Sequence, residues 1–424
     1  PKTRNKMMHD TLILCCHEGV KETKQAFGNL FSQVDYLCKA HGIKVADKIA
    51  IQTMRRHSNS QEPLSSEDLK YDARALAIFI SAVFGVDVPH ELNVLIPHTN
   101  RPYQKGLEIN NRRIRCIVKN WDNDFIRVDI DQDADEEEYL VQLKDEENHI
   151  DHTYLWDILK EGMQLNLLDC QVKQPVITPR LIVVEPDYLV DISSIATCFT
   201  AFGHHPLLYL LNQMKPRANT QATLLGNFAG AALDDIINTN GKYQMNETIK
   251  TNFREKALEF CTCPWFDAKK FYTDANQQAF NLQQVVDILF PRTASQAQMS
   301  AFRGESLYDR KKAILEPSFV CEALGIQGRV DLMTTDCKLL VEQKSGRNMN
   351  IETHQVDPGY HSYQLEPHYV QLLLYYGVLQ HNFKLSNDRV NIRLLYSKYQ
   401  PQDGLMVVAY YQKLFKEAIE YRNQ

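Results

Sequence analysis

The stretch "IQGRVDLMTTDCKLLVEQKSGR", Ile326 to Arg347, decides how the C-terminal half of the chain folds. Its apolar runs, such as 339–341, predict strands that are buried in a sheet. Asp331, Glu342 and Lys344 stand within or beside those runs. Ionisable side chains are rare in buried strands unless they are paired, so these three residues indicate a site rather than a plain core.

The segment "TTDC", Thr334–Cys337, predicts a turn between two strands. With an even-numbered loop, position 331 pairs with position 340, and paired residues share a face. Side chains alternate along a strand, so Leu340, Glu342 and Lys344 lie on one face together with Asp331. An odd-numbered loop would place Asp331 on the opposite face.

Two carboxylates on one face are hard oxygen ligands suited to Mg²⁺ or Mn²⁺. Such an ion can acidify water and neutralise charge on a phosphate, and Lys344 could stabilise the transition state. Asp331, Glu342 and Lys344 therefore predict phosphodiester cleavage. The alternative interpretation is a solvated strand face with no catalytic role.

Two neighbouring features favour the catalytic interpretation. Glu316, in "ILEPSF", is expected on the strand before the hairpin and adds an acid nearby. In the predicted helix "HYVQLLLYYG", His368, Gln371 and Tyr375 form one stripe at helical spacing. An imidazole, an amide and a phenol suit contacts to phosphates or bases, although an exposed polar helix face would have the same pattern.

Gly-Arg-Val-Asp (328–331), Glu-Gln-Lys (342–344) and Gln371-x-x-x-Tyr375 resemble, in order and spacing, the motifs of PD-(D/E)XK nucleases of the RecB-like branch. That branch includes CRISPR-associated exonucleases and the nuclease domain of replication helicase–nucleases that trim 5′ flaps. The resemblance covers about 186–400. It implies a restriction-endonuclease-like α/β core, with a mixed central sheet flanked by helices.

The resemblance also implies roles for individual residues. Asp331 and Glu342 would be metal ligands, the Gln343 carbonyl a third, and Lys344 the catalytic lysine. The cofactor would be Mg²⁺ or Mn²⁺. The residues expected to contact DNA are Arg329, His368, Gln371 and Tyr375.

The chain departs from the family pattern in the first helix of the core. The family has Gly-x-x-x-His there, and the histidine binds the metal. In "LLGNFAGAALDDII" Gly226 is in place, but Gly230 occupies the histidine position. Asp234, one turn later, is the expected substitute, and Asp235 is the other candidate. An amphipathic helix with both acids facing water is the alternative.

Several relatives carry an iron–sulfur cluster held by one cysteine before this helix and three beyond the last strand. Cys198 matches the first position, but no cysteine follows Cys337. Either the protein lacks the cluster or the chain ends before reaching it, so no iron–sulfur cluster is expected in this chain. The pair Cys261 and Cys263 could bind metal, although ordinary free thiols are the favoured interpretation.

The remaining sequence predicts three regions: a helical region at 1–99, a β-rich and possibly barrel-like region at 100–188, and the nuclease core at 189–424. The clearest helix is predicted for 65–85, with Ser65 and Asp68 as a capping box and Gly85 as its stop.

The sequence also indicates the cellular compartment in which the protein is expected. The start of the sequence has no signal-peptide pattern and no apolar run is long enough for a membrane, so we expect a cytoplasmic protein with no membrane contact. Ten cysteines in 424 residues then predict reduced thiols.

The net charge of −6 gives no global attraction to nucleic acid, so DNA would have to bind a local basic surface. Basic clusters occur at Arg303 with 310–312 and at 112–115 with Trp121, and each could equally be ordinary surface charge.

These observations predict a metal-dependent DNA nuclease acting on single-stranded or flap DNA. The alternative is a catalytically weak or inactive module that binds single-stranded DNA within a helicase–nuclease assembly. The sequence contains no P-loop motif, so a helicase or ATPase partner would be a separate chain or a missing segment.

Overall fold

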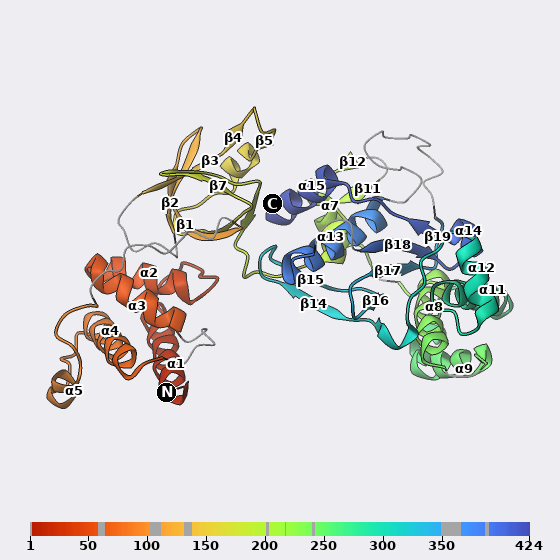
Figure 1. Ribbon diagram of the computed structural model, residues 1–424, viewed down its shortest axis with the longest axis horizontal. Coiled ribbons are helices and arrows are strands. Elements are labelled where there is room, and N and C mark those ends of the chain that lie inside the picture. The colour runs from red at the N-terminus through yellow and green to blue at the C-terminus, as the bar shows by residue number, and fades with distance from the viewer. Residues whose placement is uncertain are drawn as a thin grey trace. The chain divides into compact units, whose positions relative to one another are not determined.

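The computed structural model describes residues 2–57, 64–101, 112–130, 138–200, 203–216, 218–239, 242–348, 366–385 and 390–424. It is a mixed α/β protein with N-terminal helices and several mixed sheets (Figure 1). The chain divides into two compact units, residues 1–188 and 189–424.

The first unit begins with helices that pack around a small core containing Leu12, Val34, Ile51 and Phe79. The helices are α1 (Lys2–Gly19), α2 (Leu30–Ala40), α3 (Val45–His57), α4 (Ser66–Phe84) and α5 (His90–Leu95). The helix predicted from "SSEDLKYDARALAIFISAVFG" is confirmed as α4. Its Ser65–Asp68 capping box and a left-handed Gly85 at its end are both present.

A seven-stranded sheet in the order β7-β8-β3-β2-β1-β6-β9 forms the rest of this unit. Closure into a barrel would require pairing between β7 and β9, and the described strands show none. The strands of this sheet are β1 (Arg113–Trp121), β2 (Phe125–Ile130), β3 (Tyr139–Gln142), β6 (Gln164–Leu168), β7 (Gln171–Lys173), β8 (Val176–Thr178) and β9 (Leu181–Val184). A short ribbon of β4 (Lys144–Asp145) and β5 (Ile150–Asp151) and the 3₁₀ helix Thr153–Asp157 accompany it.

The second unit is built on a mixed five-stranded sheet in the order β13-β16-β17-β18-β19. Its strands are β13 (Ala313–Leu315), β16 (Leu332–Thr334), β17 (Leu339–Lys344), β18 (Asn391–Tyr396) and β19 (Leu405–Val407). A three-stranded sheet joins β10 (Val190–Asp191), β15 (Ile326–Arg329) and β14 (Ser318–Cys321), and a small hairpin joins β11 (Phe199–Thr200) to β12 (Gly203–His204).

Helices surround these sheets (Figure 1). They are α6 (Ile192–Ala196), α7 (Leu207–Met214), α8 (Gln221–Asn238), α9 (Met245–Glu255), α10 (Ala257–Cys261), α11 (Ala268–Leu289), α12 (Ala294–Phe302), α13 (Glu366–Phe383), α14 (Pro401–Gly404) and α15 (Gln412–Asn423), with a 3₁₀ turn at Arg310–Lys312. In the described parts of the chain, no helix has both the length and the apolar character needed to cross a membrane.

The predicted helix at "EPHYVQLLLYYGVLQHN" and the strand in "RVNIRLLYSKY" are confirmed as α13 and β18. The hairpin of β11 and β12 was not predicted, because two-residue strands are too short to have a period. The core of this unit lies between the sheet and the paired helices α8 and α11. Phe228 of α8 and Leu282 of α11 pack in one cluster with Leu339 and Val341 of β17.

A charged cluster joins the β11–β12 hairpin to two helices of this unit. The Nε2 atom of His204 lies 2.5 Å from Glu366 at the start of α13, and its Nδ1 atom lies 2.9 Å from Glu417 of α15. These two hydrogen bonds raise the pKa of His204 to about 9, and His204 holds the pKa of Glu417 below its ordinary value. At neutral pH a charged imidazole therefore bridges two carboxylates.

We predict that His204→Gln lowers the free energy of unfolding by about 1–2 kcal/mol at pH 6, after allowing for solvent screening. The folded-state pKa lies above the ordinary value of 6.5, so the contribution is fully present below that value and is lost as pH rises through about 9. The melting temperature of His204→Gln should lie a few degrees below that of the parent protein at pH 6. At pH 10 the two melting temperatures should be equal. His205→Gln, at the exposed neighbouring position, is the control; an equal deficit at both pH values would contradict the prediction.

Candidate functional site

The register of the β16–β17 hairpin places the first two predicted site residues opposite each other. Leu332 pairs with Val341 and Met333 with Leu340, so Asp331, just before β16, faces Glu342. The predicted pairing of 331 with 340 is wrong, because the turn lies at 335–338, one residue later than "TTDC", which moves the pairing by two residues. The Thr334 hydroxyl accepts bonds from the Lys338 and Leu339 amides, which closes this turn.

A row of three acids crosses neighbouring strands next to the core. Leu332 and Val341 belong to the cluster that packs on α8 and α11. The next row across β13, β16 and β17 contains Glu316, Asp331 and Glu342. The amide of Glu316 donates to the carbonyl of Asp331 at 2.9 Å, which fixes this alignment. Since adjacent strands lie about 4.8 Å apart, the row places the backbones of three acids next to one another.

Glu342 is a buried carboxylate with only one of its oxygens bonded. The residue is 2% exposed. Its Oε1 accepts from Lys344 Nζ at 2.7 Å, whereas Oε2 is buried and has no hydrogen-bond partner. Burial raises the pKa of Glu342 to about 7, against the opposing effect of Lys344. An unbonded buried carboxylate oxygen is costly, which is typical of a position that binds a ligand.

Asp331 is held in place by the neighbouring strand. Its Oδ2 accepts from the backbone amide of Gln343 at 2.6 Å. Burial raises the pKa of Asp331, while Lys344 and the Gln343 amide act in the opposite direction. The Gln343 side chain is buried and donates to the Ser397 hydroxyl at 2.8 Å, so only its backbone belongs to the acid row.

Helix α8 contributes a fourth acid to this site. Burial, followed by the charges of Glu316 and Asp331, raises the pKa of Asp234 to about 7. Asp235 is exposed, and its Oδ2 accepts from the Thr248 hydroxyl at 2.5 Å. Of the two acids that the sequence left open, Asp234 is therefore the one that interacts with the acid row.

Position 230, where the resemblance would place a metal-binding histidine, is a glycine with open space beside it. A Cβ atom added at Gly230 would have no neighbour within 4 Å, whereas one at Gly226 would lie 3.2 Å from the Ser345 hydroxyl. Helix α8 therefore approaches the end of β17 at Gly226 and leaves room beside Gly230.

Glu316 and Arg329 form an exposed ion pair at the edge of the acid row. Glu316 has a positive φ of 47°, an uncommon conformation for a residue other than glycine, and its carboxylate lies 3.1 Å from Arg329. The Arg329 side chain is 61% exposed. The sequence indicated Glu316 only as a nearby acid. Its charge on Asp234 and Asp331 became evident from the pairing of β13 with β16.

The predicted stripe on α13 lies against the same site. The Tyr375 hydroxyl donates to the Arg329 carbonyl at 2.6 Å and is hydrogen-bonded to Gln371. Tyr375 is 3% exposed, and burial, followed by the charges of Glu342 and Asp331, raises its pKa. Its position supports the loop that carries Asp331, and a role in binding DNA stays a prediction.

His368 lies further along the stripe, close to Lys344. Its Nδ1 atom is 3.1 Å from the Tyr396 hydroxyl. Burial, with a contribution from Lys344, lowers the pKa of His368 to about 4. The imidazole is therefore neutral at physiological pH and offers a hydrogen bond rather than a charge.

The donor set suits a hard divalent cation. Carboxylates and a backbone carbonyl are the ligands that Mg²⁺ and Mn²⁺ prefer, and the unbonded Glu342 Oε2 is a free acceptor. Throughout the described ranges, no three His, Cys, Asp or Glu side chains converge in a ready-made metal-ligand arrangement. Asp331 and Glu342 bond instead to a backbone amide and to Lys344.

The cysteines show no disulfide: all ten are free thiols. Cys198, which matches the first iron–sulfur position, is buried and points its Sγ toward the Pro206 carbonyl. Cys263 is buried and Cys261 is exposed.

The basic clusters are largely engaged within the protein. Arg310 donates to the Ile236, Ile237 and Thr239 carbonyls, where its charge stabilises the end of α8. Lys312 lies 3.1 Å from Asp336. In the first unit, Arg115 pairs with Asp187 at 3.0 Å and Trp121 packs against the sheet core.

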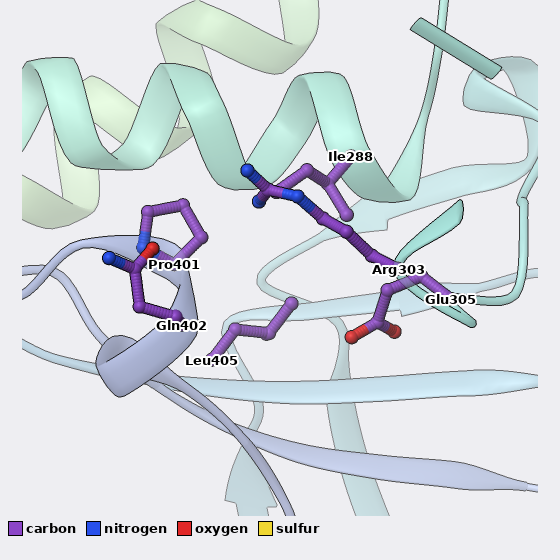
Figure 2. Close-up of a pocket in the computed structure, with 6 residues that line it drawn as sticks. All are labelled: Ile288, Arg303, Glu305, Pro401, Gln402 and Leu405. Carbon is purple, nitrogen blue, oxygen red and sulfur yellow. The ribbon is translucent and has the colours of Figure 1, made fainter. Parts of the chain in front are cut away.

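A cavity of about 390 Å³ lies apart from the acid row (Figure 2). The Arg303 guanidinium lies beside Ile288, and Glu305 pairs with the buried Arg393 at 2.6 Å. The cavity is lined by Ile288, Arg303, Glu305, Pro401, Gln402 and Leu405, so none of the acids of the row takes part.

Compared with known proteins, the sequence matches no family model and no curated relative.

We predict that Tyr375→Phe lowers the free energy of unfolding by about 1–2 kcal/mol, because it leaves the Arg329 carbonyl without its buried donor. Chemical denaturation followed by circular dichroism measures this change. Tyr272→Phe is the matched control, because its hydroxyl bonds to Asn246 at the surface, and it should shift stability by less than about 0.5 kcal/mol. Equal changes in the free energy of unfolding would show that the hydrogen bond of Tyr375 stabilises the protein no more than a surface hydrogen bond does.

Proposed function

We propose that the protein is a metal-dependent nuclease that hydrolyses phosphodiester bonds in single-stranded or flap DNA. The observation that carries the proposal is the buried Glu342 carboxylate, with one oxygen on Lys344 and the other unbonded, opposite Asp331. A structural ion pair would not require the second acid, Asp331, or the further acids on β13 and α8.

The residues that would hold the cation are Asp331, Glu342, the Gln343 carbonyl and Asp234. Bound there, Mg²⁺ or Mn²⁺ would supply Lewis-acid chemistry, lowering the pKa of water and neutralising charge on the phosphate. Burial helps to raise the pKa of each of the three carboxyl groups, so they gain most from a positive partner. This gain supports the fit of a cation to the site.

Lys344 would act next to these acids. Its ammonium group shares a strand face with Glu342, and its stem is mostly buried. A cation so placed can orient a nucleophilic water and stabilise negative charge that develops on the phosphate oxygens. The neutral His368 beside it can accept or donate a single hydrogen bond to the substrate.

Recognition of the strand would depend on groups around the acid row. Arg329 is largely exposed and can exchange its partner Glu316 for a phosphate. Gln371 and Tyr375 would orient the nucleotide next to the cleaved bond. The mixed five-stranded sheet between α8, α11 and α13 supports the assignment to a restriction-endonuclease-like core, with DNA as the partner.

A second function is favoured by one observation, the glycine at position 230. Without the family's histidine the cation loses one ligand, so the chain could instead be a weak or inactive nuclease that binds single-stranded DNA. A helicase or ATPase on another polypeptide would then be its working partner.

The first test compares cleavage of a labelled single-stranded oligonucleotide in Mg²⁺ or Mn²⁺. We expect Glu342→Gln and Lys344→Ala to reduce the rate by about 100-fold or more, since each removes a charge that stabilises the transition state. Asp234→Asn should also be slow, whereas the matched Asp235→Asn should cut normally because Asp235 bonds to Thr248 instead. Binding without cleavage by the unaltered protein would favour the second function, and cleavage unaffected by Glu342→Gln would exclude this site.

The second test restores the missing ligand. Gly230→His should tighten Mn²⁺ binding by about tenfold, measured by isothermal titration calorimetry, because an imidazole fits the open space at this position. Gly230→Ala is the control: it stabilises the helix by about 1 kcal/mol without adding a ligand, so Mn²⁺ affinity should not change. If both variants bind Mn²⁺ like the parent, position 230 does not face the cation.

A further inference from the structure

Trp265 is an aromatic side chain displayed on the surface of the second unit. Its side chain is 98% exposed, although a tryptophan is among the costliest residues to leave in water. Leu258, one helical turn before Thr262 on α10, is also 74% exposed. Helix α10 and the short segment that follows it therefore each present one large apolar side chain to solvent.

The local structure fixes the backbone from which the indole projects. Trp265 has a positive φ of 58°, a strained conformation for a bulky residue. On one side Cys263 is buried, and on the other Phe266 packs in an aromatic cluster with Phe253, Phe260 and Phe271. Because its neighbours are anchored in the core, Trp265 cannot turn inward.

Two lysines follow the indole within five residues of the sequence. Lys269 and Lys270 lie in the first turn of α11 and are both exposed. The nearby acids are already engaged: Asp267 caps α11 by accepting from the Lys270 amide, and Glu259 lies 3.8 Å from Lys256. An exposed aromatic ring next to two lysines combines the stacking and phosphate contacts that bind unpaired nucleic acid.

Helix α8 connects this surface to the acid row. The Asp267 amide donates to Gln221, the first residue of α8, at 2.8 Å. Five residues along the helix, about 7.5 Å at 1.5 Å per residue, Gly226 lies against Ser345, the neighbour of Lys344. Gly230 and Asp234 follow at one-turn intervals, and the open space at Gly230 would let a strand approach the backbone.

We propose that Trp265 is a stacking platform for a base of the unpaired strand, a few nucleotides from the bond that is cut. Lys269 and Lys270 hold the adjoining phosphates, and the strand continues along the glycine side of α8 to Asp234. This inference rests on the proposed function. It names a residue that would select the unpaired form of the substrate, because a base can stack on the indole only when it has left a duplex.

The experiment measures binding of a labelled oligothymidylate to the full chain with calcium in place of magnesium, by fluorescence anisotropy. Trp265→Gly removes the ring and relieves the positive φ, so its melting temperature should not fall. Its dissociation constant should rise by about 5- to 150-fold, the measured range for loss of one stacked base. Trp265→Phe should retain most of the affinity, and Trp156→Phe, in the other unit, should bind as the parent does.

A salt series separates the nucleic-acid role from a protein-docking role. Replacing Lys269 and Lys270 by glutamine should reduce the slope of log K against log salt by about 1.4, because each contact to a single strand contributes about 0.7. If Trp265→Gly and the lysine variant keep the affinity and the salt slope of the parent protein, the inference is overturned and a protein partner at Trp265 is favoured. In that case the parent protein would still cleave DNA in a Glu342-dependent reaction, so the proposed function would stand. If the parent protein neither binds nor cleaves the oligonucleotide, the proposed function itself is contradicted.

Discussion

The register between β16 and β17 is the constraint on which the candidate site depends. Pairing of Leu332 with Val341 buries that row against α8 and α11 and leaves the next row to Asp331 and Glu342. A shift of one residue would turn a strand over, putting a carboxylate into the core and an apolar side chain, Leu332 or Val341, at the site. The same hydrophobic contacts that stabilise the unit therefore hold the acids together.

The acids themselves oppose folding. Burial helps to raise the pKa of Asp234, Asp331 and Glu342, so each loses solvation that its neighbours only partly replace. Lys344 and the Gln343 amide offset part of this cost. Retaining such a cluster lowers stability, and stability is commonly given up where a protein binds a ligand or performs chemistry.

The two sides of helix α8 contact different parts of the unit. Phe228 and Leu233 pack into the core, whereas Gly226, Gly230 and Asp234 lie toward the end of β17 and the acid row. Position 230, where the resemblance would place a histidine, belongs to this second side and lies outside the core cluster.

The sequence by itself determined the long regular elements and indicated the main residues of the candidate site. Periodicity and caps suffice for α4 and α13, because their contacts are local, and alternation along β17 puts Glu342 and Lys344 on one face. Only the tertiary structure decided the position of the turn at 335–338, the choice of Asp234 over Asp235, and the addition of Glu316. These depend on contacts between residues far apart in the chain, which no local pattern encodes.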